Sequence, residues 1–268
     1  MDENKYFSRL VDYKLYAIDN GIFDALGLIP EDIDYSLKRS VPITEGVDPD
    51  LDYALPAEID DLVRLHFLLR TRKVTTVLEF GVGKSTVVIN LALRQNKYAY
   101  GDFVANHLRR SEAFKGYSID NNERWLRATS ESAAIENIEL WLSEVRMAEW
   151  QGRICTLYDR LPNICPDFIY LDGPDQHTVL GDIRGISTRA GDRLPMAADI
   201  LAIEHFLLPG CLILVDGRTA NVRFLLSNLQ RNWIYTYLSE FDQHLIELVE
   251  EPLGFINRTQ LDFCLGSR

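Results

Sequence analysis

Cysteine is scarce in this chain and follows no ligand pattern. The 268 residues include four cysteines, with no CxxC pair and no histidine at a zinc-ligand spacing. Structural zinc sites and dense disulfide frameworks need clustered cysteines. The sequence therefore predicts neither of these two kinds of protein.

Long apolar runs and positive charge are also lacking. No window approaches the roughly 18 apolar residues of a membrane span, and the N-terminal MDENKYFSRLVDYKLY has no signal-peptide core. We therefore expect a cytoplasmic protein without a membrane partner. Lys and Arg number 28 against 40 Asp and Glu, a net charge of −12. Because binding to phosphate backbones needs a basic surface, we expect no nucleic-acid partner. Whether identical copies associate stays open.

From Val74 onward, short apolar runs alternate with helical stretches. Uninterrupted apolar strands separated by helices are typical of a mainly parallel sheet with helices on both faces. The pattern predicts an α/β fold with a Rossmann-like, doubly wound, mainly parallel sheet of seven strands. The expected strands are Thr76–Phe80, Gly116–Ile119, Ile138–Leu142, Phe168–Leu171, Cys211–Val215, Tyr235–Leu238 and Leu261–Leu265, with helices near 84–95, 122–134, 194–207 and 218–231.

Residues 1–57 differ from the rest because Pro, Gly and Asp interrupt their short amphipathic pieces. Such punctuation predicts a helical and loop extension rather than a separate domain. Residues 58–268 then form one domain, which opens with an amphipathic helix. Residues 97–115 fit neither a strand nor a helix pattern well, and we expect an insertion there.

The stretch VLEFGVGKST contains a glycine turn that resembles a phosphate loop. The pattern GxxxxGK[ST] needs a glycine five residues before the Gly-Lys pair, where this chain has Leu78. A shortened KGGxGKST variant of some ATPases is matched only from Gly81 to Thr86, and Glu79 stands where that family has its signature lysine. A carboxylate beside a triphosphate is unfavourable. A P-loop ATPase of the deviant GKST type nevertheless remains an alternative.

An apolar strand followed by Glu79 and Gly-x-Gly resembles instead the first motif of the class I S-adenosylmethionine-dependent methyltransferases. The resemblance implies that Glu79, Gly81 and Gly83 bind the cofactor, with glycines that let the backbone approach it. The third glycine of the usual pattern is replaced by Ser85. Ser85 and Thr86 could donate their hydroxyls to the methionyl carboxylate at the helix N-terminus.

Four further motifs follow in the order of that family. GYSID ends in Asp120, which the resemblance implies for the ribose hydroxyls, and RICTLYDRLP places Tyr158 and Asp159 near the adenine. PDFIYLDGPDQH places Asp172 at a strand end, and LILVDGR ends a further strand. Each motif is loose alone, and their order along the chain supports the assignment.

The resemblance also suggests which side chains act on the acceptor. His177 is the candidate general base, since imidazole titrates near neutral pH, or it orients a loop through a hydrogen bond. Asp172 is catalytic or cofactor-binding, and Asp216 and Arg218 face the acceptor. Arg218 would bind an acidic acceptor or pair with a surface acid. Asp172 and Asp216 could also hold Mg²⁺, although Gly217 stands where relatives carry a further metal ligand.

The predicted function is methyl transfer from S-adenosylmethionine to a small-molecule acceptor, with oxygen of a sugar or natural-product precursor as the expected site. A catalytically silent nucleoside-binding protein is the alternative outside the enzymes.

Overall fold

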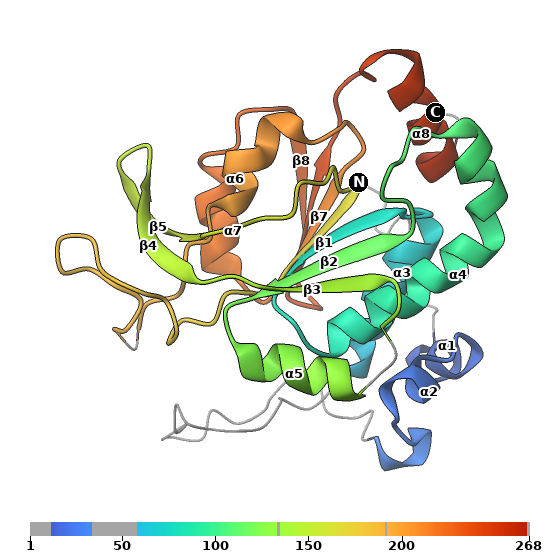
Figure 1. Cartoon of the computed structure of the whole chain (residues 1–268), viewed down its shortest axis with the longest axis horizontal. Coiled ribbons are helices and arrows are strands. Elements are labelled where there is room, and N and C mark those ends of the chain that lie inside the picture. The colour runs from blue at the N-terminus through green and yellow to red at the C-terminus, as the bar shows by residue number, and fades with distance from the viewer. Residues whose placement is uncertain (1–11, 34–57, 133–134, 191, 267–268) are drawn as a thin grey trace.

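The computed structural model describes residues 12–33, 58–132, 135–190 and 192–266. A single seven-stranded sheet organises this part of the chain, in the order β3-β2-β1-β6-β7-β9-β8 (Figure 1). The strands β1, β2, β3, β6 and β7 run parallel, whereas β9 is antiparallel to both β7 and β8. The strands are β1 (Thr76–Phe80), β2 (Lys115–Asp120), β3 (Ile138–Leu142), β6 (Phe168–Leu171), β7 (Leu212–Asp216), β8 (Trp233–Leu238) and β9 (Gln243–Leu248).

Helices cover both faces of the sheet, which confirms the predicted Rossmann-like, doubly wound class. They are α1 (Tyr13–Asp19), α2 (Ile22–Leu26), η2 (Pro30–Asp32), α3 (Ile59–Thr71), α4 (Lys84–His107), α5 (Glu123–Ser132), α6 (Asp199–Ile203), η3 (Glu204–Phe206), α7 (Thr219–Leu226) and α8 (Gly254–Leu265). Among the described residues, no helix combines the length and apolar character needed to cross a membrane.

Side chains of each central strand alternate between two hydrophobic cores. Val77 packs with α1, α2, α3 and α4 in one core, whereas Leu78 packs with α6 and α7 in the other. This alternation follows from the period of two along a strand. The described part of the 1–57 extension belongs to the first core, and its Tyr16 hydroxyl lies 3.0 Å from His66 Nδ1. Residues 34–57 of the predicted extension lie outside the described residues.

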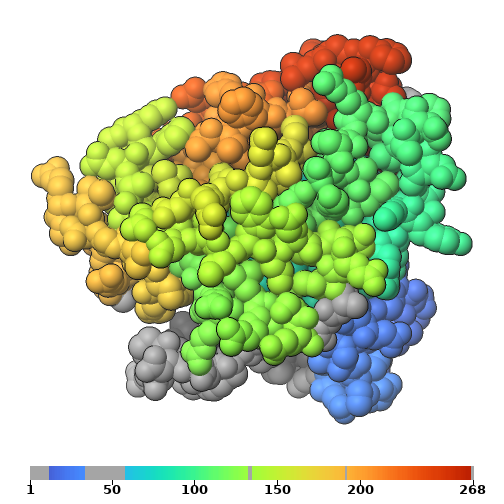
Figure 2. Space-filling model, viewed as in Figure 1, coloured from blue at the N-terminus to red at the C-terminus, as the bar shows by residue number. Residues whose placement is uncertain are grey.

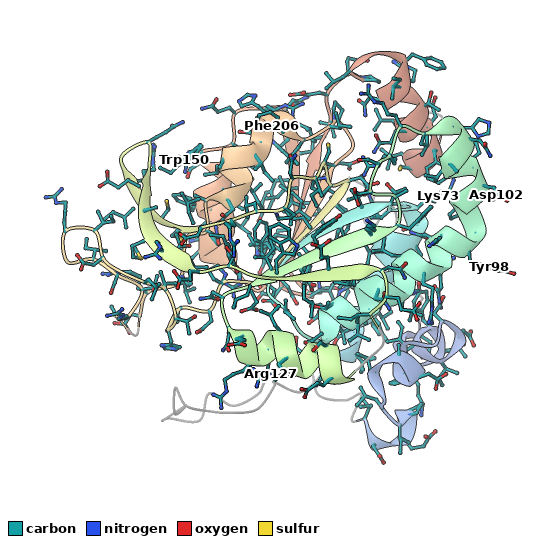
Figure 3. All side chains as sticks on the ribbon, viewed as in Figure 1. Lys73, Tyr98, Asp102, Arg127, Trp150 and Phe206 are labelled. Atoms are coloured by element: carbon teal, nitrogen blue, oxygen red, sulfur yellow. The ribbon has the colours of Figure 1, made fainter. Side chains whose placement is uncertain are left out.

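Helix α4 corrects the predicted insertion at 97–115. The helix continues without a break to His107, and only a short connection then leads to β2. Tyr98 and Asp102 point outward from its far half (Figure 3), and Tyr98 is 96% exposed. Exposed polar and aromatic residues obscure the amphipathic pattern of this half, which is why the sequence reading ended the helix early.

Near the end of the chain, one predicted strand was wrong and one strand of the sheet was not predicted. Residues 261–265 form the last part of α8, not a strand, and the buried Asn257, Gln260 and Phe263 recur at the helical spacing of three. The seventh strand is β9, which is fully buried although it contains Gln243 and Glu247. These polar side chains bond to arginines of α3 and its C-cap, so burial does not leave them unpaired.

A two-stranded hairpin, β4 (Val145–Trp150) and β5 (Arg153–Tyr158), lies outside the main sheet and was not predicted. Arg146 is paired with Leu157 in its antiparallel register. The hairpin follows β3 directly and packs on the second core through Val145, Cys155 and Tyr158. It therefore borders the edge of the sheet at which β2 and β3 end.

Candidate functional site

Four strand ends bring the predicted motifs together. Strands β2, β1, β6 and β7 are neighbours and run in the same direction. Their carboxyl ends carry Asp120, the turn at Gly81, Asp172 and Asp216. Ligands of open α/β sheets bind at this edge. The sequence prediction that these motifs share one site thus agrees with the topology.

The turns after β1 and β6 touch each other through two glycines. Gly81 has φ +103°, and its N–H donates to the carbonyl of Ile119 at 2.8 Å. A Cβ added to Gly173 would lie 2.7 Å from the Gly81 nitrogen and 2.9 Å from the Phe80 carbonyl carbon. Neither position has room for a side chain, because backbone occupies the space on both sides. Gly83 differs, since a Cβ added there would meet no protein atom within 4 Å.

Glu79 is completely buried beneath this turn. Its carboxylate accepts hydrogen bonds from the hydroxyls of Ser85 at 2.6 Å and Thr86 at 2.7 Å, and also from Ser118. Burial raises the pKa of Glu79 to about 7, against the lowering effect of the three hydroxyl donors. The hydroxyls that sequence analysis assigned to a ligand carboxylate are thus used to hold Glu79 and to fix the start of α4.

Asp120 closes the same turn from the end of β2. Its two carboxylate oxygens accept from the backbone N–H of Val82 at 2.9 Å and of Asn122 at 2.8 Å. Burial raises the pKa of Asp120 to about 6, although the backbone donors lower it. A carboxylate has about four acceptor positions. The two backbone bonds therefore leave acceptor capacity on Asp120 for a ligand.

The side chains of the consecutive residues Tyr158 and Asp159 lie in different environments. Tyr158 is buried with its ring centre 5.5 Å from that of Phe80, the last residue of β1. Its hydroxyl has no hydrogen-bond partner among the described residues, and burial raises its pKa well above the ordinary value. Asp159 is exposed and pairs with Arg146 of the hairpin at 2.9 Å. Tyr158 thus lies under the glycine turn, whereas the Asp159 carboxylate is held by a surface arginine.

Sequence reasoning missed Asp199, the first residue of α6. One carboxylate oxygen accepts the backbone N–H of Tyr158 at 3.0 Å, and the other is buried without a partner among the described residues. Burial raises the pKa of Asp199 to about 7. The sequence offers little signal, because an aspartate at a helix start ordinarily serves as a solvated first-turn residue.

On the acceptor side, Arg218 is bound to the turn after β6. Its Nη1 donates to the Pro174 carbonyl at 3.0 Å, its Nη2 donates to the Asp172 carbonyl, and Nε lies 3.5 Å from the Asp172 carboxylate. The Asp172 side chain is 55% exposed, yet crowding by the surrounding protein raises its pKa to about 6. Arg218 lowers that pKa and the charge of Asp216 raises it further. Asp216 also accepts from the Tyr170 hydroxyl at 3.3 Å.

Acidic side chains near Asp216 differ from the predicted metal pair. Carboxylate oxygens of Glu58, Asp61 and Asp216 lie within 4.8 Å of one another, and Asp172 is not part of this group. Oxygen ligands of this kind suit Mg²⁺ or Ca²⁺. However, Asp61 is already paired with the buried Arg64, and exposed acidic groups commonly occur together without a cation. The prediction of a metal on Asp172 and Asp216 stays a prediction.

His177 is exposed in the connection between β6 and α6. Its ring forms no hydrogen bond with the described residues, whereas the neighbouring Thr178 accepts from the Asn121 amide. His177 is thus held near the end of β2 by its neighbour, with its imidazole open to solvent. A hollow of about 610 Å³ lies elsewhere, between α2 and α4.

The buried acids predict how stability depends on pH. Asp199 has its pKa raised from 3.8 to about 7 in the fold, so between these values the folded chain binds more protons than the unfolded chain. Its contribution to stability is therefore complete below pH 4 and is lost as the pH rises toward 7. Asp199→Asn keeps an acceptor for Tyr158 but cannot ionise. Between pH 5 and 7.5 the wild type should lose on the order of 2 kcal/mol of unfolding free energy relative to this variant, measured by urea unfolding. If the unfolding free energies of the two proteins changed by the same amount between pH 5 and 7.5, the result would contradict the expectation.

The strand order and the strand-end site define a Rossmann-like α/β protein with a glycine turn over a buried acid. No protein-family model and no curated protein sequence matches the chain. Among solved structures, the O-methyltransferase TomG from Streptomyces achromogenes, involved in tomaymycin synthesis and in complex with SAM, aligns at 14% identity and a TM-score of 0.38, covering 94% of this chain and 100% of that one.

Two other structures align over much of the chain. The SAH-bound methyltransferase PaMTH1 of Podospora anserina has 11% identity and a TM-score of 0.40, covering 73% of this chain and 80% of its own. Cofactor-bound Rv0187 from MTB has 10% identity and a TM-score of 0.38, covering 92% and 95%. At these values the fold assignment rests on the strand order and strand directions of the chain itself.

Proposed function

We propose that the chain transfers a methyl group from S-adenosylmethionine to a small-molecule acceptor. The observation that carries the proposal is the acidic carboxyl edge of the sheet. Glu79, Asp120, Asp172 and Asp216 lie at or just below this edge, and the lone arginine among the predicted site residues, Arg218, is already paired with Asp172. Such an edge favours a cationic ligand, and S-adenosylmethionine carries its activated methyl group on a sulfonium cation.

The same residues argue against a P-loop ATPase. A phosphate loop uses its Ser or Thr hydroxyl to bind Mg²⁺ and needs a backbone cradle free of negative charge. In this chain the Ser85 and Thr86 hydroxyls both donate to Glu79. Moving them to a metal would leave the buried Glu79 carboxylate with Ser118 as its remaining hydroxyl donor, below a triphosphate, which is unfavourable.

The chain's own residues suggest how a cofactor and an acceptor are held. The open side of Gly83 and the remaining acceptor positions of Asp120 suit the backbone approach and the ribose hydroxyls of a nucleoside. Alignment of donor and acceptor supplies most of the catalysis that such a transfer needs. For a hydroxyl acceptor, the solvent-open imidazole of His177 is available to remove the proton. Oxygen as the methylated atom, and a sugar or natural-product precursor as acceptor, belong to the proposal.

Calorimetry separates the candidate functions. Titration with S-adenosylhomocysteine should show saturable binding, and titration with ATP and Mg²⁺ should not. Tight binding of ATP without a response to S-adenosylhomocysteine would establish the ATPase alternative. A screen for methyl transfer across an acceptor library, with His177→Ala as the comparison, distinguishes an enzyme from a silent nucleoside-binding protein. Binding without turnover of any acceptor would favour the silent protein.

Substitutions in the glycine turn test where the cofactor binds. Gly83→Ala adds a Cβ that meets no protein atom within 4 Å, at an extended φ that alanine adopts. The fold should therefore be unaffected. The affinity for S-adenosylhomocysteine should fall at least tenfold, because the added methyl group projects into the space in which we propose that the ligand binds. Gly81→Val should abolish binding, since its φ of +103° disfavours a β-branched residue.

A matched control for these variants is Gly101→Ala within α4, where an added Cβ also meets nothing. This variant should keep full affinity and gain slightly in stability. Unchanged affinity in Gly83→Ala would show that the cofactor site lies elsewhere.

A further inference from the structure

The connection from β6 to α6, of which residues 172–190 and 192–198 are described, forms an arch beside the carboxyl edge of the sheet. Its middle, coloured yellow to orange, projects at the left of the molecule in Figures 1 and 2. Leu180 fastens the arch to strand β4 with two backbone hydrogen bonds, of 2.8 Å to Val145 and 2.9 Å to Met147. Within the arch, the Thr188 hydroxyl donates to the Gln176 carbonyl at 2.6 Å. These bonds and isolated β-bridges give the described residues of the arch a defined course, although those residues form no helix or strand.

The first end of the arch is held by Arg218, directly before α7. Its guanidinium donates to the carbonyls of Asp172 and Pro174 and faces the Asp172 carboxylate. A planar guanidinium can serve several acceptors at once because its donors are fixed in a fork. With its side chain 23% exposed, Arg218 is already occupied by the arch rather than directed at solvent.

The other end of the arch is held by the backbone of Thr156 in β5, which bonds to Met196 and Ala198, and by Asn221 in the first turn of α7. Asn221 is 1% exposed, and its amide bonds twice to Ala197: the oxygen accepts the Ala197 N–H and the nitrogen donates to the Ala197 carbonyl, both at 3.1 Å. Two reciprocal bonds to one residue fix both the position and the orientation of the backbone there.

We propose that Arg218 and Asn221 are positioning residues that hold the two ends of the arch at the start of α7. His177 lies three residues after Pro174, whose carbonyl accepts from Arg218, and directly before Thr178, whose side-chain hydroxyl accepts from the Asn121 amide. This proposal rests on the proposed function insofar as the arch borders the acceptor. It replaces the sequence hypothesis that Arg218 binds an acidic acceptor.

Hydrogen–deuterium exchange of the full chain tests the anchoring directly. In Arg218→Gln the amides of Gly173 and of residues 175–178 should exchange about tenfold faster, since a charge-assisted hydrogen bond shifts a local opening equilibrium by about that factor. In Asn221→Ala the acceleration should fall on the Ala197 amide, because the Ala198 amide keeps its bond to the Thr156 carbonyl. Arg218→Lys keeps the charge beside Asp172 but lacks the fork, so it should lose nearly as much protection as Arg218→Gln.

The control is Arg223→Gln, an exposed position one turn further along α7. It should leave the arch unchanged. Acceleration spread over the central strands would mean that the variants destabilise the whole fold, and unchanged exchange at both ends of the arch would overturn the proposal.

A second readout separates positioning from a purely structural role. With an acceptor identified by the screen, Asn221→Ala should raise the KM of the acceptor at least fivefold while the Kd of S-adenosylhomocysteine stays within about twofold. Equal changes in both constants would assign Asn221 to the fold alone. A wild type that fails to bind S-adenosylhomocysteine would contradict the proposed function, yet the exchange comparison would still decide whether the arch is anchored as proposed.

Discussion

Gly173→Ala should lower the free energy of unfolding by about 3 kcal/mol and abolish binding at the glycine turn. The added Cβ would lie 2.7 Å from the nitrogen of Gly81 and 3.0 Å from its Cα. Both atoms belong to backbone, which cannot rotate away as a flexible side chain can. Relief of the overlap requires the ends of β1 and β6 to separate. Urea unfolding and calorimetry with S-adenosylhomocysteine measure the two effects.

Gly83→Ala is the matched control for this substitution, because it adds the same methyl group in open space to the turn after β1, which Gly173 contacts. It should preserve the unfolding free energy to within about 0.5 kcal/mol. If Gly173→Ala were equally well tolerated, the close contact of the two turns would not exist in solution.

Glu79→Ala should cost about 3 kcal/mol of unfolding free energy. The substitution removes the acceptor of three hydroxyls, of which Thr86 and Ser118 are buried, and also leaves a cavity. Each unsatisfied buried donor costs about 1–3 kcal/mol, and reorientation of hydroxyls recovers part of that cost. Because Ser85 and Thr86 start α4, the glycine turn should also lose order, which proton exchange of the Val82 and Gly83 amides would detect.

Glu79→Gln provides the comparison, since it fills the same volume and retains one acceptor oxygen. It should be destabilised by about 1 kcal/mol, clearly less than Glu79→Ala. Equal stability of all three proteins near pH 7 would mean that the hydroxyl network contributes nothing to the fold.

Sequence patterns predicted the strands in which apolar residues predominate and a turn signal follows closely. Strands β1, β3 and β6 have the expected bounds, although β1 and β3 each contain one glutamate. Strand β9 was not predicted, because Gln243 and Glu247 interrupt its apolar pattern. Their partners, Arg64 and Arg72, lie far away in the sequence. Only the fold shows that these polar groups are satisfied when buried.

The candidate site was predictable to a similar degree. Asp120, Asp172 and Asp216 could be placed because each lies at, or directly after, the last residue of a strand. The direction of the Asp159 carboxylate depends on Arg146, and hence on a hairpin whose register the sequence did not reveal. Asp199 is distinguished by burial and by its bond to the Tyr158 N–H. Those two properties come from tertiary packing and leave no local pattern.

The central position of β1 has a kinetic consequence. Strand β2, one of the two neighbours of β1, follows β1 in the sequence before β6, the other neighbour. Directly before β6, Asp167 accepts from the backbone N–H of Thr75, directly before β1. These two residues are 92 positions apart. Closing so long a loop costs entropy before any contact stabilises it, and such non-local pairing slows folding. A nascent or truncated chain that stops before Asp167 would contain the complete glycine motif without the strand that borders it. The order of synthesis therefore sets when this site can first form, well after its most recognisable residues have been made.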